Sequence, residues 1–499
     1  MQLIIQNFGP IKKGQIDLSK KVYVFVGYNN SGKTYLSQLL WSLFHNKTIE
    51  RFANEMTLKE LNLEDKDSLE LTSELLDIIL EKFSDFLTRH IIPKTLNIDS
   101  HHFTLEQLSL DFQYNLNDIK NAHREGVATL QLNEKKGQFL IISKVQGTLK
   151  VTFEEKHLPI ELMNTLQKPF LSLNENVVEQ STSSIRKVTL IKFILSVLMD
   201  NVHQPFFLPS SRLFYPIFYQ YIYRLEKEKR EALSKERDAL SQMLFELLKN
   251  KEKGEELALE SLPVHAFESH YQSPYTEPMN WLFDKIYRLN EETKVTGYYE
   301  QLVYELSQIM GGDIITKQVQ GLAPIDFYLK MNEQGNDLPM YLSSSSVNQL
   351  STLYLYFKYW AEKHNNFLMI DEPEENLHPK NQIALLNVLL EFANDNNNKV
   401  LITTHSPLLA DAVNNYIYLG WLKSQQIPID KAINSYPEIN PNLNLTEIGI
   451  YFFEGTRIIP YEQKDYGVHF KDFSYEIRKI KNISEILTDQ IYQVINKED

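Results

Sequence analysis

The eight residues GYNNSGKT, Gly27 to Thr34, constrain the fold of this chain more than any other stretch. They fit the pattern G-x-x-x-x-G-K-[ST], a glycine-rich loop that binds phosphate groups. The apolar run VYVFV before them predicts a buried strand, and the leucines after them, spaced three and four apart, predict an amphipathic helix. Because strand, loop and helix follow in the required order, we predict a phosphate site at the N-terminus of that helix.

The residue types within this motif have distinct physical tasks. Glycines allow backbone N–H groups to curl around phosphate oxygens. We expect Lys33 to reach the β- and γ-phosphates of a nucleotide, and Thr34 to ligate Mg²⁺. The residues expected to contact the nucleotide are Gly27, Asn29, Asn30, Ser31, Gly32, Lys33 and Thr34.

Two further apolar runs end in polar residues. FLMI (367–370) predicts a buried strand that presents Asp371 and Glu372 at its carboxyl end, where ligands of open α/β sheets bind. Asp371 is placed to hold Mg²⁺, directly or through water, and Glu372 to polarise an attacking water as a general base. KVLITT (399–404) predicts another buried strand, and His405 after it is placed to touch the γ-phosphate.

With GYNNSGKT, IDEPEENLHP and TTHS in this order, the chain resembles the ABC-type ATPases of the RecF, SMC and Rad50 class, within the AAA family. The resemblance covers residues 1–50 and 340–420 and is weak through 51–310. Together with the alternation of strands and helices, it implies an α/β P-loop NTPase fold. This fold is an ABC-type head with a mostly parallel core sheet, a small antiparallel sheet and a helical insertion. It also implies hydrolysis of ATP with Mg²⁺, two ATP molecules being held between two heads.

The serine run LSSSSV (342–347) lies about 25 residues before the acidic pair, where this class carries its LSGGQ signature. By this resemblance Ser344 or Ser345 contacts the γ-phosphate of a partner chain, although the glycine pair of the signature is missing. Asn376 falls in the segment that crosses the dimer interface in the same class. The alternative for the serines is a polar linker whose hydroxyl caps the following helix.

Two segments carry open alternatives. FFLPSSR (206–212) resembles a segment of smaller ATPases in this class, and its Arg212 belongs either to the active site or to a capped loop as a structural residue. The charged stretch 224–260 has leucines seven residues apart, which is typical of a short coiled coil or of a solvated helix on its own domain.

We predict two domains. Residues 1–425 form a composite head, with a helical insertion at about 156–310 and a signature helix at 342–363. Residues 426–499 form a small C-terminal α/β extension.

The amino-acid composition limits the classes of protein to which this chain can belong. Hydrophobic residues make up 43% and aromatic residues 12% of the chain, so it can build a sizeable core. It has no cysteine, which excludes disulfides and thiolate chemistry. No signal peptide or membrane span is recognised, so we expect a soluble, cytoplasmic protein. The net charge of −14 does not indicate nucleic-acid binding, although it allows a local basic groove.

The overall plan resembles the stand-alone ATPases of bacterial antiphage systems such as Septu and PARIS. This resemblance implies a homodimer or higher homo-oligomer, built around ATP, that controls a separately encoded effector such as a nuclease or toxin. The alternative is a RecF-like DNA-repair or DNA-clamp ATPase. The motor subunit of a transporter is less favoured because that class keeps an intact LSGGQ.

Overall fold

The computed structural model divides the chain into two compact units, which are described separately. The first comprises Met1–Ile92, Ser100–Phe207 and Ala361–Asp499, and the second Pro93–Asp99 and Leu208–Trp360. The structure describes residues 1–56, 68–98, 107–132, 136–159, 182–199, 203–214, 275–290, 293–318, 325–332, 337–430, 433, 436, 439–441, 443, 447–461, 479 and 481–488.

A nine-stranded sheet, ordered β5-β1-β2-β16-β15-β3-β14-β13-β9, organises the first unit. Its strands are β1 (Gln2–Phe8), β2 (Ile11–Asp17), β3 (Val22–Gly27), β5 (Ser109–Gln113), β9 (Gln204–Leu208), β13 (Asn366–Asp371), β14 (Lys399–Thr404), β15 (Ile448–Glu454) and β16 (Arg457–Pro460). β15, β3, β14 and β13 are parallel to one another, whereas β5, β1 and β2 pair antiparallel. Every residue of β3, β13 and β14 is buried, which agrees with the apolar run in the interior of each strand.

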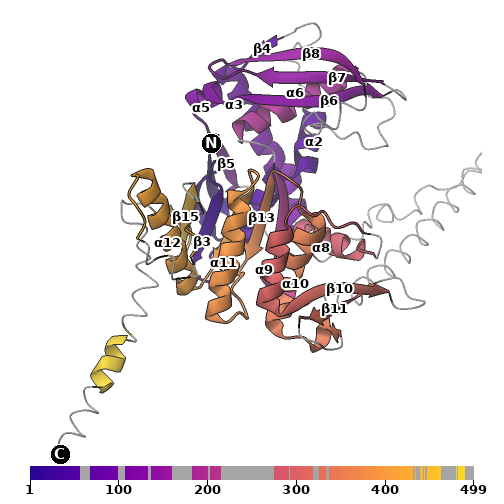
Figure 1. Cartoon of the computed structure of the whole chain (residues 1–499). Helices are drawn as coiled ribbons and strands as arrows, with labels where there is room; N and C mark the ends of the chain where they lie inside the picture. Colours follow the sequence, from indigo (N-terminus) through magenta and orange to yellow (C-terminus); the bar gives the residue numbers. More distant parts are fainter. Residues whose placement is uncertain are drawn as a thin grey trace, which may run out of the picture. The chain divides into compact units, whose positions relative to one another are not determined.

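Helices connect and cover the parallel strands. α1 (Lys33–Phe44) follows β3 and is continued by α2 (Asn46–Glu55), and α11 (Pro379–Asn394) joins β13 to β14. α12 (Pro407–Ser424) follows β14 and packs against α11 (Figure 1). Each of these connections begins at the carboxyl end of a buried strand, so the loops between strand and helix share one edge of the sheet.

Two strands of this sheet come from the region predicted as a C-terminal extension, 426–499. β15 pairs with β3 in parallel, with Phe453 opposite Gly27, and β16 pairs with both β15 and β2. A side chain at Gly14 of β2 would meet Ile458 of β16, since a Cβ there would lie 2.5 Å from its Cδ1. These strands therefore complete the sheet that carries the phosphate loop, while the domain boundary itself stays a prediction.

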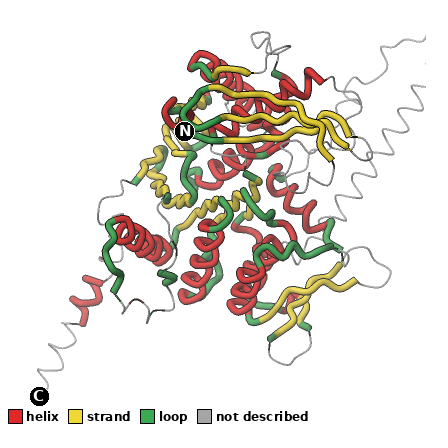
Figure 2. The backbone as a smooth tube through the Cα atoms, turned by 45° about the horizontal axis from the view of Figure 1, so that its top comes forward, coloured by secondary structure: helices red, strands yellow, loops and turns green. Residues whose placement is uncertain are grey.

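The predicted small antiparallel sheet is confirmed in the same unit (Figure 2). Its order is β4-β8-β7-β6, and α6 packs against β6 and β7. The elements are β4 (Ser68–Glu70), β6 (Arg124–Leu132), β7 (Lys136–Lys144), β8 (Lys150–Pro159) and α6 (Thr182–Leu198). The first unit also contains α3 (Ser73–Phe86), which contacts β5, together with η1 (Leu87–Ile91) and α5 (Leu116–Asn121). α4 (Ile92–Leu96) begins at the last residue of the segment Met1–Ile92, and its other residues belong to the second unit.

The second unit holds helices and a three-stranded antiparallel sheet, β10-β11-β12. Its elements are η4 (Ser210–Phe214), α8 (Glu277–Tyr287), α9 (Glu300–Met310), β10 (Gly312–Gln318), β11 (Ile325–Met331), β12 (Leu338–Pro339), η7 (Met340–Leu342), α10 (Ser345–Leu355) and η8 (Tyr356–Trp360). The Tyr354 hydroxyl of α10 donates to Asp313 of β10 at 3.0 Å, which ties helix to sheet.

The predicted signature helix, 342–363, is shorter in the structure. The α-helix covers 345–355, and one π-helical turn carries it to Trp360. The charged segment 224–260 lies outside the described residues. Among the helices that are described, none is both long and apolar enough to cross a bilayer.

Candidate functional site

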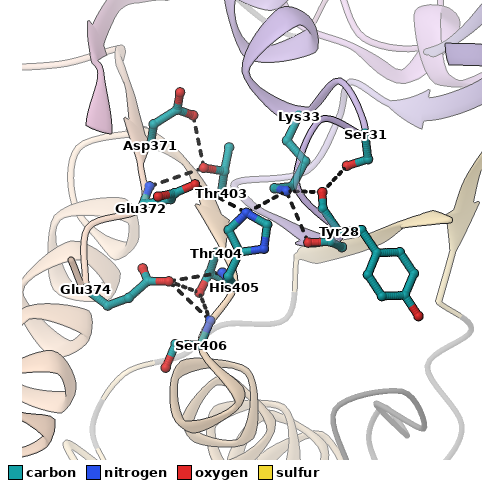
Figure 3. A network of polar contacts seen from close by, with 11 residues as sticks. Tyr28, Ser31, Lys33, Asp371, Glu372, Glu374, Thr403, Thr404, His405 and Ser406 are labelled. Carbon is teal, nitrogen blue, oxygen red and sulfur yellow. Dashed lines mark hydrogen bonds and ion pairs between the residues drawn. The ribbon is translucent and has the colours of Figure 1, made fainter. Parts of the chain in front are cut away.

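Three loops meet at the carboxyl edge of the parallel strands β3, β14 and β13. The strands end nearly level, because Thr403 lies opposite Asp371 and Thr404 opposite Val26. The three loops hold residues 28–32, 405–406 and 372–378. Figure 3 shows the side chains of Lys33, Glu372 and His405 turned toward one another, whereas the ring of Tyr28 points away. The sheet therefore brings together residues that are more than 300 positions apart in the chain.

The phosphate loop has a backbone that ordinary residues adopt poorly. Asn30 and Gly32 have φ of 59° and 97°, and Gly32 is the N-cap of α1. Gly27 has φ of 150°, and a Cβ there would lie 2.5 Å from the carbonyl oxygen of Phe453. The Ser31 hydroxyl donates to the carbonyl oxygen of Tyr28 at 2.7 Å and closes the loop. Glycine at 27 and 32 is thus a steric requirement, and the loop ends at a helix N-terminus that favours anions.

Lys33 lies buried at the centre of the site. Its ammonium donates to the carbonyl oxygens of Gly27 at 3.1 Å and Tyr28 at 2.9 Å. Burial lowers the pKa of Lys33 to about 8, and the carboxylates of Glu372 and Asp371 oppose this shift. The cation therefore stands next to acidic groups and still loses its proton far more readily than a surface lysine.

Asp371, the last residue of β13, and Glu372 after it are both held by Thr403 of β14. The Thr403 hydroxyl donates to Asp371 Oδ1 at 3.0 Å, and the Glu372 N–H donates to the Thr403 carbonyl oxygen at 3.0 Å. Glu372 has φ of 45°, a left-handed conformation that costs a residue of this type about 1–3 kcal/mol. The neighbouring strand thus fixes the strained backbone and aims both carboxylates at the edge of the sheet.

His405 stands between the lysine and one of these acids. Its Nε2 lies 3.0 Å from Lys33 Nζ and 3.3 Å from Glu372 Oε1. The unprotonated nitrogen accepts from Lys33, and the protonated nitrogen donates to Glu372, so one protonation state cannot make both hydrogen bonds. His405 therefore links the phosphate-binding cation to the candidate general base.

The predicted magnesium ligands have suitable chemistry. Thr34 offers an exposed hydroxyl in the first turn of α1, and Asp371 a buried carboxylate polarised by Thr403. In the described part of the chain no three His, Asp or Glu side chains form a metal cluster. Mg²⁺ is commonly bound by one or two protein oxygens together with water and substrate phosphates, so this small donor set fits the ion.

The remaining predicted nucleotide contacts of the first unit are solvent-facing. Asn29 and Asn30 are exposed at the tip of the phosphate loop. Asn376 is exposed in the turn after β13 and has φ of 60°, a conformation that asparagine tolerates. Their proposed contacts stay predictions.

In the second unit, Ser344 and Ser345 are exposed at the N-terminus of α10. Ser344 is the N-cap, and its hydroxyl accepts from the Val347 N–H at 3.4 Å. This contact is the capping role that the sequence left open. Ser345, one residue later, is exposed in the first turn, where backbone N–H groups and the helix dipole favour anions.

Arg212, the other open case, is completely buried in the second unit. Its guanidinium donates to the carbonyl oxygens of Gln349 at 3.0 Å and Pro209 at 3.1 Å. Arg212 thus fastens α10 to η4, which favours the structural alternative.

One residue of the site was missed in the sequence. Glu374 is 8% exposed and accepts three hydrogen bonds, one from Thr404 at the end of β14 and two from the backbone of His405 and Ser406. Burial raises the pKa of its carboxyl group. The additional acids in IDEPEEN could in principle have pointed to Glu374. Consecutive acids in a turn are usually solvated, however, and the burial of Glu374 depends on β14.

Comparison with known proteins identifies the family. A family model described as AAA ATPase domain matches residues 1–410. No curated protein matches the chain.

Similar solved structures include three SMC heads, each 10% identical to this chain. "SMC head domain from Thermotoga maritima" has a TM-score of 0.28, over 92% of this chain and 98% of that one. The Smc head domain with an extended coiled coil bound to the C-terminal domain of ScpA, derived from Pyrococcus furiosus, has a TM-score of 0.31, over 96% and 98%. An SmcHead bound to the C-winged helix domain of ScpA also has 0.31, over 93% and 97%.

The family match covers most of the chain and includes all three loops of the site. It agrees with the predicted P-loop ATPase fold, and the structure has the predicted large sheet with a parallel core and the small antiparallel sheet. The chain belongs to the AAA ATPase domain family and is an ATPase.

Proposed function

We propose that this ATPase is a switch that dimerises around ATP and controls a partner effector, a nuclease or toxin, in bacterial antiphage defence. The convergence of Lys33, Asp371, Glu372 and His405 at one edge of the sheet is the observation that carries the ATP-dependent part. The link to an effector rests on the likeness of the motif order to stand-alone defence ATPases.

Nucleotide binding falls to the phosphate loop. Backbone N–H groups of 29–34 surround the phosphates, and the Lys33 ammonium leaves the carbonyl oxygens of Gly27 and Tyr28 for the β- and γ-phosphate oxygens. Thr34 and Asp371 hold Mg²⁺, which when bound neutralises charge on the phosphate oxygens.

The loops after β13 and β14 supply the residues for hydrolysis. Glu372 takes a proton from the attacking water as a general base, and its fixed backbone keeps the carboxylate aimed. His405 touches the γ-phosphate and registers its loss. Because Lys33 and Glu372 flank the same imidazole nitrogen, a change in the position of Lys33 alters the partner of His405.

The second chain supplies Ser345, assisted by Ser344, at the positive end of its α10. Asn376 contacts the same interface. ATP is then sandwiched between the phosphate loop of one protomer and the serines of the other. Hydrolysis removes the γ-phosphate that both protomers share, and this loss separates them and changes the state of the effector.

Sedimentation of the purified chain tests the switch. Glu372→Gln removes the general base and leaves the phosphate loop intact, so this variant should form a stable dimer with ATP and Mg²⁺. Lys33→Ala should stay in the nucleotide-free state because it cannot grip the phosphates. A Glu372→Gln chain that remains monomeric at saturating ATP contradicts the sandwich.

Affinity capture from the native operon tests the control of an effector. The Glu372→Gln chain with ATP and the Lys33→Ala chain serve as matched baits, since they represent the two proposed states. We expect the product of a neighbouring gene to bind one bait preferentially, and deletion of that gene to abolish protection in a phage plating assay. Tight duplex-DNA binding that weakens steeply with salt would instead support the RecF-like alternative.

A further inference from the structure

Glu374 lies between the two loops that carry the proposed base and sensor. It belongs to the turn after β13, three residues beyond Asp371, and is 8% exposed. The donors to its carboxylate are Thr404, the last residue of β14, and His405 and Ser406 of the loop that follows (Figure 3). Glu374 is not among the residues proposed to bind phosphate or Mg²⁺.

One carboxylate oxygen makes all of these contacts. Oε1 accepts from the Thr404 hydroxyl at 2.5 Å, from the His405 N–H at 3.1 Å and from the Ser406 N–H at 3.2 Å. Oε2 is buried and has no hydrogen-bond partner among the described residues. Because its donors belong to the three consecutive residues Thr404, His405 and Ser406, Oε1 ties the backbone around His405 to the turn after β13.

A second tie between the same two segments comes from Thr403 of β14. Its hydroxyl donates to Asp371, and its carbonyl oxygen accepts from Glu372. Thr403 thus fixes the acids against β14, and Glu374 fixes the backbone of His405 against the loop of the acids. Between these two ties, His405 Nε2 stands 3.3 Å from Glu372 Oε1.

We infer that Glu374 is a positioning residue for ATP hydrolysis: its Oε1 holds the His405 backbone so that the imidazole and the Glu372 carboxylate keep their separation. This inference rests on the proposed roles of Glu372 and His405. In this role, Glu374 contacts neither the nucleotide nor the attacking water. It acts only through the loop that contains His405. Ser406 is also the N-cap of α12, so the tie extends to the start of that helix, where a negative charge is favourable.

A matched pair of variants distinguishes the loss of the hydrogen-bond acceptor at position 374 from the loss of side-chain packing there. Glu374→Gln keeps an oxygen that accepts hydrogen bonds, whereas Glu374→Met keeps the length of the side chain and offers no such acceptor. Glu375→Met is the control, since this neighbouring acid is exposed in the same turn. All chains are assayed for steady-state ATPase activity, for binding of a non-hydrolysable ATP analogue and for the unfolding temperature.

We expect Glu374→Met to lower kcat by roughly 100-fold, the loss typical of misplacing a reacting group by about 1 Å. Binding of the analogue should change less than about 3-fold, because the phosphate loop is untouched. Glu374→Gln should recover to within roughly 10-fold of wild type, and Glu375→Met should behave as wild type. A folded Glu374→Met chain with unchanged kcat, or one that loses analogue binding as strongly as kcat, overturns the inference.

A double-mutant cycle with His405 distinguishes positioning from stability. If Glu374 acts through His405, then Glu374→Met should add little to the loss already caused by His405→Ala. Full additivity of the two losses contradicts this route. Should Glu374→Met not fold, Thr404→Val decides, since it removes one of the three donors and keeps its shape. We expect a fall in kcat of roughly 3- to 10-fold, and an unchanged kcat overturns the inference.

Glu372→Gln is assayed in parallel, so that a failure of the inference about Glu374 can be told apart from a failure of the proposed function. Unchanged hydrolysis in that variant refutes the role of Glu372 whatever Glu374 does. A large loss in Glu372→Gln with none in Glu374→Met refutes the positioning role alone.

Discussion

The affinity for ATP should fall as pH rises through 8, because Lys33 loses its charge there. Burial lowers the pKa of Lys33 from 10.5 to about 8. In the nucleotide-free protein, half of the Lys33 side chains are therefore deprotonated at about pH 8. The bound nucleotide favours the ammonium form, since its phosphate oxygens are negatively charged and a neutral amine lacks the charge that pairs with them. The terminal phosphate is fully ionised above pH 8, as phosphate monoesters lose their second proton near pH 6, and adds no titration of its own.

The size of the effect follows from the pKa. If only the protonated form of Lys33 binds ATP, the apparent Kd increases by the factor 1 + 10^(pH − 8), which is roughly 2-fold at pH 8 and roughly 11-fold at pH 9. A lysine with the ordinary value of 10.5 would change Kd by only about 3% at pH 9. The difference between the two cases is about 1.4 kcal/mol and is easily measured.

Titration calorimetry in EDTA measures this dependence without the metal. Between pH 7 and 9 the apparent Kd should rise about 10-fold. The heat should depend on the ionisation enthalpy of the buffer, because binding takes up about half a proton at pH 8 and nearly one at pH 9. Lys33→Arg is the control, since its guanidinium remains charged throughout. A flat Kd in the wild type, or an equal slope in Lys33→Arg, refutes the reasoning.

Four further predictions concern the base, the two serines and the packing of β2 against the C-terminal strand β16. Glu372→Gln should lower kcat by about 10²- to 10⁴-fold and leave nucleotide binding intact, and equal ATP hydrolysis in wild type and variant would refute the assignment of the base. Ser344→Ala should cost about 1 kcal/mol of stability in thermal unfolding, because it removes the cap of α10. Ser345→Trp should leave stability and ATP binding unchanged but block ATP-dependent dimerisation in sedimentation, and a dimer of normal affinity would exclude the serine from the interface. Gly14→Val should destabilise the chain by about 1–3 kcal/mol through overpacking against Ile458, and Ile458→Ala should relieve part of this loss in a double-mutant cycle. Strict additivity would mean that the two strands do not pack together.

The site is recognised in the sequence where local chemistry dictates the structure. A glycine-rich loop followed by Lys33 and Thr34 fits only a turn between strand and helix, and the apolar runs before Asp371 and His405 are long enough to be buried strands. These local patterns specify the strands of the parallel core and the side chains at their carboxyl ends. The same local character explains the capping role of Ser344, which was an open alternative.

Other features depend on contacts that no local pattern records. β15 and β16 lie within a region predicted as a separate extension, yet β15 pairs with the strand of the phosphate loop, more than 400 residues earlier in the chain. Strand pairing at that distance is decided by backbone hydrogen bonds and by the close approach of Phe453 to Gly27, which the sequence alone does not reveal.

The sequence by itself determined the chemistry of this protein: a phosphate loop, an acidic pair and a histidine, each at the end of a buried strand. Only the tertiary structure decided how these groups act on one another. It places Lys33 in a buried site that lowers its pKa, sets one nitrogen of His405 between Lys33 and Glu372, and buries Glu374 under the histidine loop. The physical reason is that burial and hydrogen bonding depend on which strands become neighbours, whereas the type of each side chain is fixed by the sequence.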